Sequence, residues 1–284
     1  MTTKVTTFWD KQIARAEHLT EESSGAQELL AFYAELLRAQ KEIYTSLRSR
    51  EDWSPSGDLE SDLIVVVSTA SALLEAVARH GPDALAAEAQ ALLDSEPDLM
   101  IHTLIDYWRS PSDTQFFAKA VLQPYMRLLA ETSTRPIGRE LAANSEVAAS
   151  REVVIGRELA YAERNCPFCG GAPQLSFLIS KESSSESGNR DLLCATCLSS
   201  WEFRRVICAN CGEEQPAKLG YFHSPEFNHI RIEACDSCKH YLKGIDLTRS
   251  GLAVPLVDEI YGAPLDLWAR EHGYRKIELN LIGL

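Results

Sequence analysis

Eight cysteines are the residues of this sequence with the clearest chemistry, because all of them occur in four Cys-x-x-Cys pairs. The pairs lie within 73 residues of the 284-residue chain, and no cysteine occurs elsewhere. Two intervening residues let both sulfurs of a tight turn face one ion, and thiolate sulfur is a good ligand for zinc and iron. In a reducing compartment such pairs indicate metal ligands rather than disulfides. The candidate ligands are Cys166, Cys169, Cys194, Cys197, Cys208, Cys211, Cys235 and Cys238.

The spacing of the four pairs reveals a repeat. The first pair recurs 42 residues later as the third pair, and the second recurs 41 residues later as the fourth. Repetition at a nearly constant distance indicates duplicated structural units. We therefore expect the first and second pairs to bind one ion and the third and fourth pairs to bind a second. The competing arrangement, in which the second and third pairs share an ion, would break the repeat.

Each four-cysteine unit is expected to be a small ribbon of the rubredoxin or zinc-ribbon type. A unit of this size builds little hydrophobic core, so the metal should stabilise its fold directly. Gly170 and Gly212 follow the first and third pairs and can supply the positive φ of such a turn, whereas the other two pairs lack this glycine. Four thiolates suit zinc and also a single iron, and an iron–sulfur cluster is the less favoured alternative. The sites are either purely structural or redox-active.

The segment before the cysteines is expected to be helical. Apolar side chains recur at spacings of three and four over residues 29–47, which predicts a long amphipathic helix. A second helix is expected over residues 58–79 and should stop at Gly81. Pro124 lies inside a further helical pattern and predicts a kink or a break. Residues 141–162 also have a helix-forming composition.

The pattern changes near Arg164, where short β-type runs appear at residues 175–179 and 201–207. The expected fold class is α+β, with an all-α N-terminal helical domain followed by two tandem rubredoxin-like, or zinc-ribbon, modules. The expected bounds are 1–163 for the helical domain, 164–206 for the first module and 207–284 for the second module with a C-terminal helix. Near the last cysteine pair, Glu233 and Lys243 are expected to form an ion pair.

The charge distribution argues against nucleic acid as a partner. The net charge is −13; residues 1–163 hold 26 acidic and 15 basic side chains, and residues 164–284 hold 15 and 13. Two four-thiolate sites would make the second half more negative still. A zinc-ribbon nucleic-acid binder relies on basic clusters that neutralise phosphate, so this class is a remote alternative. The acidic helical half is either a solvated surface or a docking face for a basic partner segment.

The sequence also lacks several recognisable segments. Its N-terminus has no basic start followed by an apolar core, as a signal peptide would have. The longest charge-free apolar run in its helical half, 63–74, is too short to cross a bilayer. We therefore expect a cytoplasmic protein without membrane insertion. No nucleophile elbow, phosphate-binding glycine loop or His-Glu-x-x-His run occurs, which indicates that the protein is not an enzyme.

Taken with these motifs, the sequence resembles the FdhE family, accessory proteins of formate dehydrogenase maturation. The resemblance rests on the order of the four cysteine pairs, on Trp201 and Arg204, and on segments 117–125, 219–221, 233–243 and 257–274. It implies a chaperone-like role in the cytoplasm, in which the protein binds the formate dehydrogenase catalytic subunit before export or activation. It also implies iron as the metal, with zinc as the alternative. A rubredoxin-like redox or oxygen-sensing protein is the alternative function, and the oligomeric state stays open.

Overall fold

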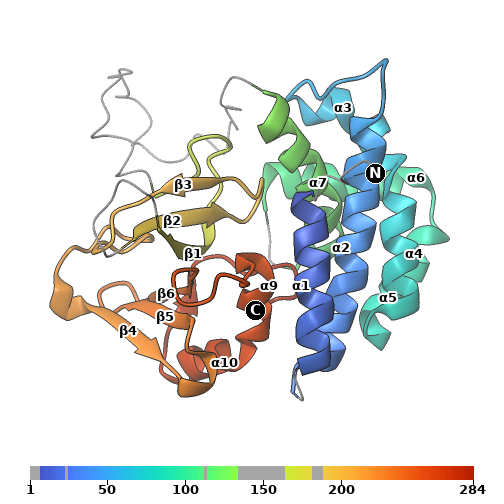
Figure 1. Cartoon of the computed structure of the whole chain (residues 1–284). Helices are drawn as coiled ribbons and strands as arrows, with labels where there is room; N and C mark the ends of the chain where they lie inside the picture. The colour runs from blue at the N-terminus through green and yellow to red at the C-terminus, as the bar shows by residue number, and fades with distance from the viewer. Residues whose placement is uncertain (1–6, 23–24, 112–113, 134–163, 181–187) are drawn as a thin grey trace, which may run out of the picture. The chain divides into compact units, whose positions relative to one another are not determined.

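The chain forms two compact units of different structure, shown in Figure 1. This computed structural model describes residues 7–22, 25–111, 114–133, 164–180 and 188–284. The first unit comprises Met1–Thr132 and Leu252–Ala263, and the second comprises Ser133–Gly251 and Pro264–Leu284. The α+β class, with helices first and a sheet second, is confirmed. The helix expected over residues 141–162 lies outside the described residues.

The first unit is helical and is organised around α2. This helix packs against α1, α4 and α7, and its buried face carries apolar side chains every three or four residues, which confirms the helix expected over residues 29–47. α7 continues through Pro124, so of the kink or break expected there, a break does not occur. The helices are α1 (Phe8–Glu22), α2 (Gln27–Arg48), α3 (Leu59–Val67), α4 (Ala70–His80), α5 (Asp83–Leu93), α6 (Pro97–Arg109), α7 (Phe116–Thr132) and α9 (Pro255–Tyr261).

The single helix expected over residues 58–79 is wrong, because the chain turns between α3 and α4. The hydroxyl of Ser68 donates a hydrogen bond to the carbonyl of Val65, and that of Thr69 donates to the carbonyl of Val66, each at 2.7 Å. Side-chain donors that bond to helix carbonyls compete with the next turn of the helix. Within the described residues no single helix has the length and hydropathy of a membrane span; α3 and α4 have them only as a pair bent by 55°.

Helix α9 comes from the C-terminal part of the chain but packs in the helical unit. The guanidinium of Arg15 in α1 donates two hydrogen bonds to the carboxylate of Asp258 in α9, at 3.0 and 2.6 Å, and both side chains are buried. A buried bidentate pair of this kind fixes both position and orientation. The compact units therefore divide the chain differently from the domain bounds expected from sequence, which grouped residues 252–263 with the second ribbon.

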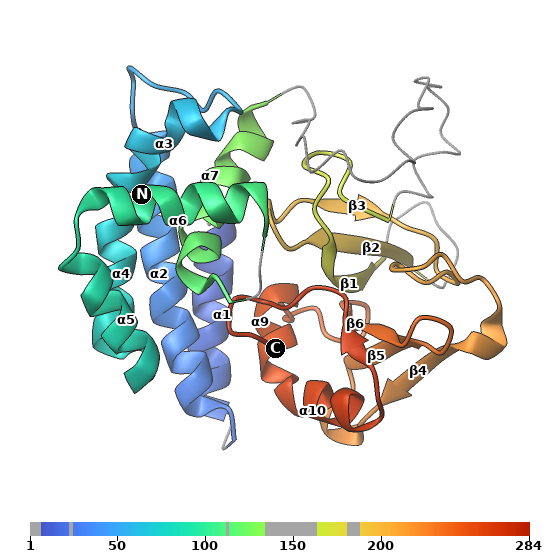
Figure 2. The same cartoon turned by 180° about the vertical axis from the view of Figure 1, so that it is seen from behind.

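The second unit contains, among its described residues, one seven-stranded sheet. Six strands follow in the order β3-β2-β1-β6-β5-β4 (Figure 2), and β7 pairs with β6. β1 to β3 form one antiparallel meander and β4 to β6 form another; the parallel pair β1–β6 joins the two. The elements are β1 (Pro173–Ile179), β2 (Asn189–Cys194), β3 (Ser200–Glu202), β4 (Leu219–His223), β5 (Ile230–Cys235), β6 (His240–Asp246), α10 (Ala263–Glu271) and β7 (Arg275–Lys276), with short 3-10 helices at Pro216–Lys218 and Pro225–Phe227.

The two meanders, which we call the first and second ribbon, therefore share one sheet. β1 contains the β-type run expected at residues 175–179, whereas the strand expected at 201–207 ends already at Glu202. Beyond this end, the amide of Phe203 donates to the carbonyl of Arg190 at 2.9 Å, and the carbonyl of Arg204 accepts a hydrogen bond from the side chain of Arg190 at 3.0 Å.

Candidate metal centres

Each Cys-x-x-Cys turn, which we call a knuckle, is closed by backbone hydrogen bonds that repeat between the ribbons. The amide of Cys166 donates to the carbonyl of Gly171, and the amide of Gly170 donates to the carbonyl of Cys166, both at 2.8 Å. In the third knuckle the amides of Cys208 and Gly212 make the equivalent bonds at 2.9 and 3.0 Å. The duplication inferred from spacing is therefore also present in the local backbone geometry.

A residue with positive φ follows the second cysteine in all four knuckles. The φ angles are 73° at Gly170, 57° at Leu198, 81° at Gly212 and 58° at Lys239. A left-handed conformation costs a residue other than glycine about 1–2 kcal/mol, so it persists at Leu198 and Lys239 because the surrounding turn requires it. Sequence reasoning did not identify these two residues. The spacing of the repeat does show that the two positions are equivalent, since Leu198 and Lys239 lie 41 residues apart, as the second and fourth knuckles do.

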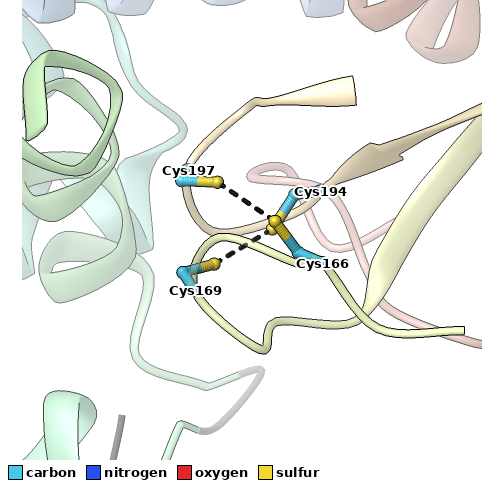
Figure 3. Close-up of side chains that lie close together, drawn as sticks. All are labelled: Cys166, Cys169, Cys194 and Cys197. Carbon is cyan, nitrogen blue, oxygen red and sulfur yellow. Dashed lines mark hydrogen bonds between the residues drawn. The ribbon is translucent and has the colours of Figure 1, made fainter. Parts of the chain in front are cut away.

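The eight sulfurs form two groups of four, and within each group they all lie within 4.8 Å of one another. In the first group, shown in Figure 3, Cys166 Sγ lies 3.6 Å from Cys197 Sγ, and Cys169 Sγ lies 3.5 Å from Cys194 Sγ. The two equivalent separations in the second group are both 3.7 Å. All eight cysteines are free thiols rather than disulfides. The grouping joins the first knuckle to the second and the third to the fourth, as the repeat predicted.

These separations fit a single tetrahedral ion in each group. Sulfurs that surround one ion at about 2.3 Å in a tetrahedron are about 3.8 Å apart. Both groups can therefore hold a metal with little movement of the side chains. The donor set of four thiolates suits zinc and a single iron alike. With a divalent ion, each site carries a net charge of about −2.

The two sites differ in exposure to solvent. All four cysteines of the first site are buried. In the second site Cys208 and Cys235 are buried, Cys238 is half-buried and Cys211 is exposed. An ion in the first site is thus enclosed by protein, whereas an ion in the second site is accessible from the side of Cys211.

Burial and hydrogen bonds shift the pKa values of the free thiols in opposite directions. Burial raises the pKa of Cys194 well above its usual value. Hydrogen bonds from Cys166 and its neighbours lower the pKa of Cys197 instead, so the metal-free group ionises unevenly. At the second site burial acts against ionisation of Cys238, but hydrogen bonds from Asn210 and from the backbone lower its pKa to about 6. Metal binding must release the remaining thiol protons and is therefore pH-dependent.

The ion pair expected between Glu233 and Lys243 is wrong. In the register of β5 and β6, Glu233 lies opposite Leu242, so its side chain and that of Lys243 point to opposite faces of the sheet. The ammonium of Lys243 instead binds the carboxylate of Asp266 in α10, and both side chains are fully buried. The hydroxyl of Tyr241 donates to the same carboxylate at 2.8 Å, so this buried charge pair ties α10 to the sheet.

Comparisons with known proteins agree on one family. The model of the FdhE central domain matches residues 165–205, and that of the FdhE C-terminal domain matches residues 206–282. Over 118 residues the chain is 43% identical to a protein FdhE homolog of Aquifex aeolicus (42% of this chain, 41% of that protein). Over 121 residues it is 32% identical to the homolog of Pseudomonas aeruginosa (41% and 38%). The matched part of the chain thus spans about two fifths of these relatives' length.

A solved structure extends the likeness in fold to nearly the whole chain. The crystal structure of the FdhE protein from Pseudomonas aeruginosa superimposes with a TM-score of 0.68 at 20% sequence identity. The superposition covers 98% of this chain and 96% of that chain. The fold of the helical unit is therefore also similar to that of the Pseudomonas aeruginosa protein, although the two family models match only residues 165–282.

Proposed function

This chain belongs to the FdhE family, and on that premise we propose that it is an accessory protein of formate dehydrogenase maturation. It acts in the cytoplasm, where it binds the formate dehydrogenase catalytic subunit before export or activation. The observation that carries the proposal is the match of residues 165–282 to both FdhE domains, at the segment that contains the two four-cysteine sites. The role is one of binding rather than of catalysis.

The metal centres supply the stable surface that such binding requires. Each site holds one ion, and the ion fixes two knuckles that would otherwise be separate loops. The ligands are the cysteines at 166, 169, 194 and 197 for the first ion and those at 208, 211, 235 and 238 for the second. Iron is the metal that we propose on the basis of the family resemblance, and zinc is the alternative that the same donor set accepts. The helical unit contributes the rest of the contact surface.

Co-purification tests the proposed partner directly. The full chain is expressed together with a tagged formate dehydrogenase catalytic subunit, and complexes are isolated from oxidised and from reduced extracts. We expect the chain to be retained by the tagged subunit and not by an unrelated tagged protein of similar size. A Cys194→Ser, Cys235→Ser variant, which lacks one ligand at each site, should be retained less. Absence of any association in both extracts would contradict the proposal.

A redox function is the second candidate, and the exposure of Cys211 favours it. If the second site holds iron, the ion lies close enough to solvent at Cys211 to exchange an electron with a partner or to react with oxygen. Metal analysis together with visible absorption of protein isolated without air distinguishes the candidates. Charge-transfer bands that disappear on reduction support the redox function, and stoichiometric zinc without such bands excludes it.

A further inference from the structure

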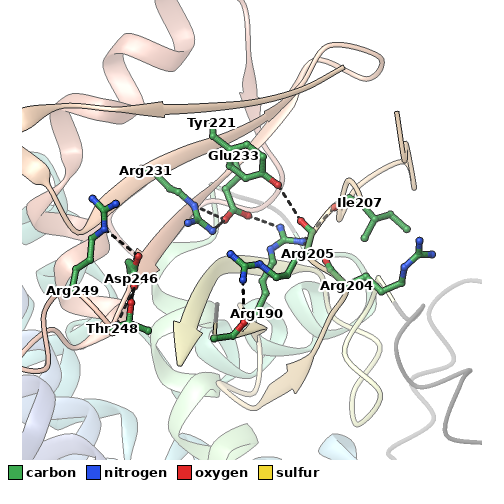
Figure 4. Close-up of polar contacts among 11 residues, drawn as sticks. Arg190, Arg204, Arg205, Ile207, Tyr221, Arg231, Glu233, Asp246, Thr248 and Arg249 are labelled. Carbon is green, nitrogen blue, oxygen red and sulfur yellow. Dashed lines mark hydrogen bonds and ion pairs between the residues drawn. The ribbon is translucent and has the colours of Figure 1, made fainter. Parts of the chain in front are cut away.

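A buried group of charged side chains lies between the first and second ribbons (Figure 4). At its centre is the carboxylate of Glu233 on β5, which binds two arginines. Arg190 on β2 donates to Glu233 Oε2 at 2.5 Å, and Arg231 on β5 donates to Glu233 Oε1 at 2.9 and 2.6 Å. The side chains of Arg190 and Glu233 are only 4% and 6% exposed. Partners in such a pair depend on each other, because removing one leaves the other charge buried and uncompensated.

The repeat shows that this group connects the ribbons asymmetrically. A shift of 41 residues, which relates the second and fourth knuckles, also relates Arg190 to Arg231. The same shift relates Glu233 to Leu192, so the first ribbon has the arginine but a leucine at the position equivalent to the acid. The arginine of the first ribbon therefore binds the acid of the second.

The neighbouring strand accommodates the group through a glycine. A Cβ at Gly244 on β6 would lie 2.6 Å from Glu233 Oε1 and 3.1 Å from Arg231 Nε. Contacts this short are not tolerated, so a side chain at this position would displace the carboxylate. β2 and β5 thus supply the charged side chains, and β6 leaves room for them because Gly244 has no side chain.

Arg190 also holds the chain that leads into the second metal site. Besides Glu233, its guanidinium donates to the carbonyls of Arg204 and Ile207, at 3.0 and 3.3 Å. Ile207 immediately precedes Cys208 in the third knuckle. On the other side, Glu233 stands two residues before Cys235 in the fourth knuckle. One side chain of the first ribbon is therefore attached to the entry of both knuckles of the second site.

We propose that Arg190 is a positioning residue through which the two metal sites are coupled, so that metal in the first site raises the affinity of the second. The inference rests on the proposed binding of one ion at each site. β2 carries Arg190 and ends at Cys194, a ligand of the first site. An ion in the first site holds this strand end, and the strand holds the guanidinium against the third and fourth knuckles. Thermodynamic linkage makes the effect reciprocal.

Metal titration of the full chain tests the coupling. Co²⁺ is the probe, because its thiolate absorption reports site loading, and a chelator sets the free concentration. Cys169→Ser disables the first site, and Arg190→Met removes the guanidinium. Each change should weaken the second site about tenfold, the range found when outer partners of metal ligands are removed. The double variant should be no weaker than either single variant, since both changes break the same connection.

Two comparisons separate coupling from a general loss of structure. Arg249→Ala removes an exposed arginine that pairs with Asp246, and we expect it to leave both affinities unchanged. Arg190→Lys keeps the positive charge but not the guanidinium fork that reaches several acceptors. This variant should therefore fold and show a partial loss of metal affinity at the second site. It decides the outcome if Arg190→Met does not fold. The proposal is overturned if Cys169→Ser leaves the second site unchanged or if the losses in the double variant add.

The same titrations show whether failure lies with this inference or with the proposed function. Two bound Co²⁺ ions with independent affinities would remove the coupling and keep both metal sites. Absence of thiolate-bound Co²⁺ at either site would remove the metal binding on which the proposed function also relies.

Discussion

Replacing Gly212 with alanine should weaken the second metal site much more than the first. Gly212 has a φ of 81° in the third knuckle, and a Cβ added there meets only Arg164 Nη1, at 3.9 Å. Space for the methyl group is therefore available, and the cost is one of backbone conformation alone. For alanine in the left-handed region this cost is about 1–2 kcal/mol.

The penalty falls on the metal-bound state, because the ion imposes the knuckle conformation and the metal-free loop can relax. A change of 1.4 kcal/mol corresponds to a factor of ten in an equilibrium constant, so we expect the affinity of the second site to fall about 5- to 30-fold. Competition with a chelator, followed through thiolate absorption, measures this change. Gly212→Asn should recover part of the loss, because asparagine tolerates the left-handed region better than alanine does.

Gly57 provides a matched control. It has a φ of 89° with no atom within 4 Å of an added Cβ, and it lies in the helical unit. Gly57→Ala therefore carries the same conformational penalty without touching a knuckle. It should lower the stability of the helical unit and leave both metal affinities unchanged. An unchanged second site in Gly212→Ala, or an equal loss of metal in Gly57→Ala, would refute the role assigned to the knuckle conformation.

Further predictions concern metal removal, the first site and pH. A chelator should strip the second site before the first, because Cys211 is exposed while the first site is enclosed; equal release rates in site-resolved metal analysis would contradict this. Gly171→Ala should weaken the first site about tenfold or more, since its Cβ would lie 3.0 Å from Cys194 Sγ and overpacking costs about 1–3 kcal/mol. Hydrogen bonds from Lys41 and Thr7 lower the pKa of Asp10 below its usual 3.8, so its carboxylate stabilises the fold above that pH and loses this effect as the pH falls. The difference in Tm between the native chain and Asp10→Asn should therefore shrink from about pH 6 to about pH 3, and a difference independent of pH would contradict it.

Much of the metal centre could be predicted from the sequence because its determinants are local. A knuckle depends on two cysteines three positions apart, and the shift of 41 or 42 residues between repeats identified which knuckles belong together. The left-handed residues Leu198 and Lys239 were missed because residue type is a guide to positive φ only where glycine is used. Their equivalence to each other was nevertheless available from the repeat.

The connections between elements could not be predicted, because they depend on contacts distant in sequence. Nothing local in β1 or β6 indicates that they pair in parallel and merge the ribbons into one sheet. The partner of Lys243 depends on the register of β5 and β6, because neighbouring residues of a strand point to opposite faces of the sheet. That register places Lys243 on the face opposite to Glu233. Likewise, α9 belongs to the helical unit because Asp258 meets Arg15, 243 residues away in the chain.

Anaerobic metal quantitation of the full chain and of Cys208→Ser tests the two-site arrangement most directly. We expect two metal ions per native chain without inorganic sulfide, and one ion in the variant, held by the enclosed first site. Visible absorption of the same samples identifies the metal as iron or zinc. One ion or none in the native chain, or a sulfide-bridged cluster, would contradict two separate four-cysteine sites.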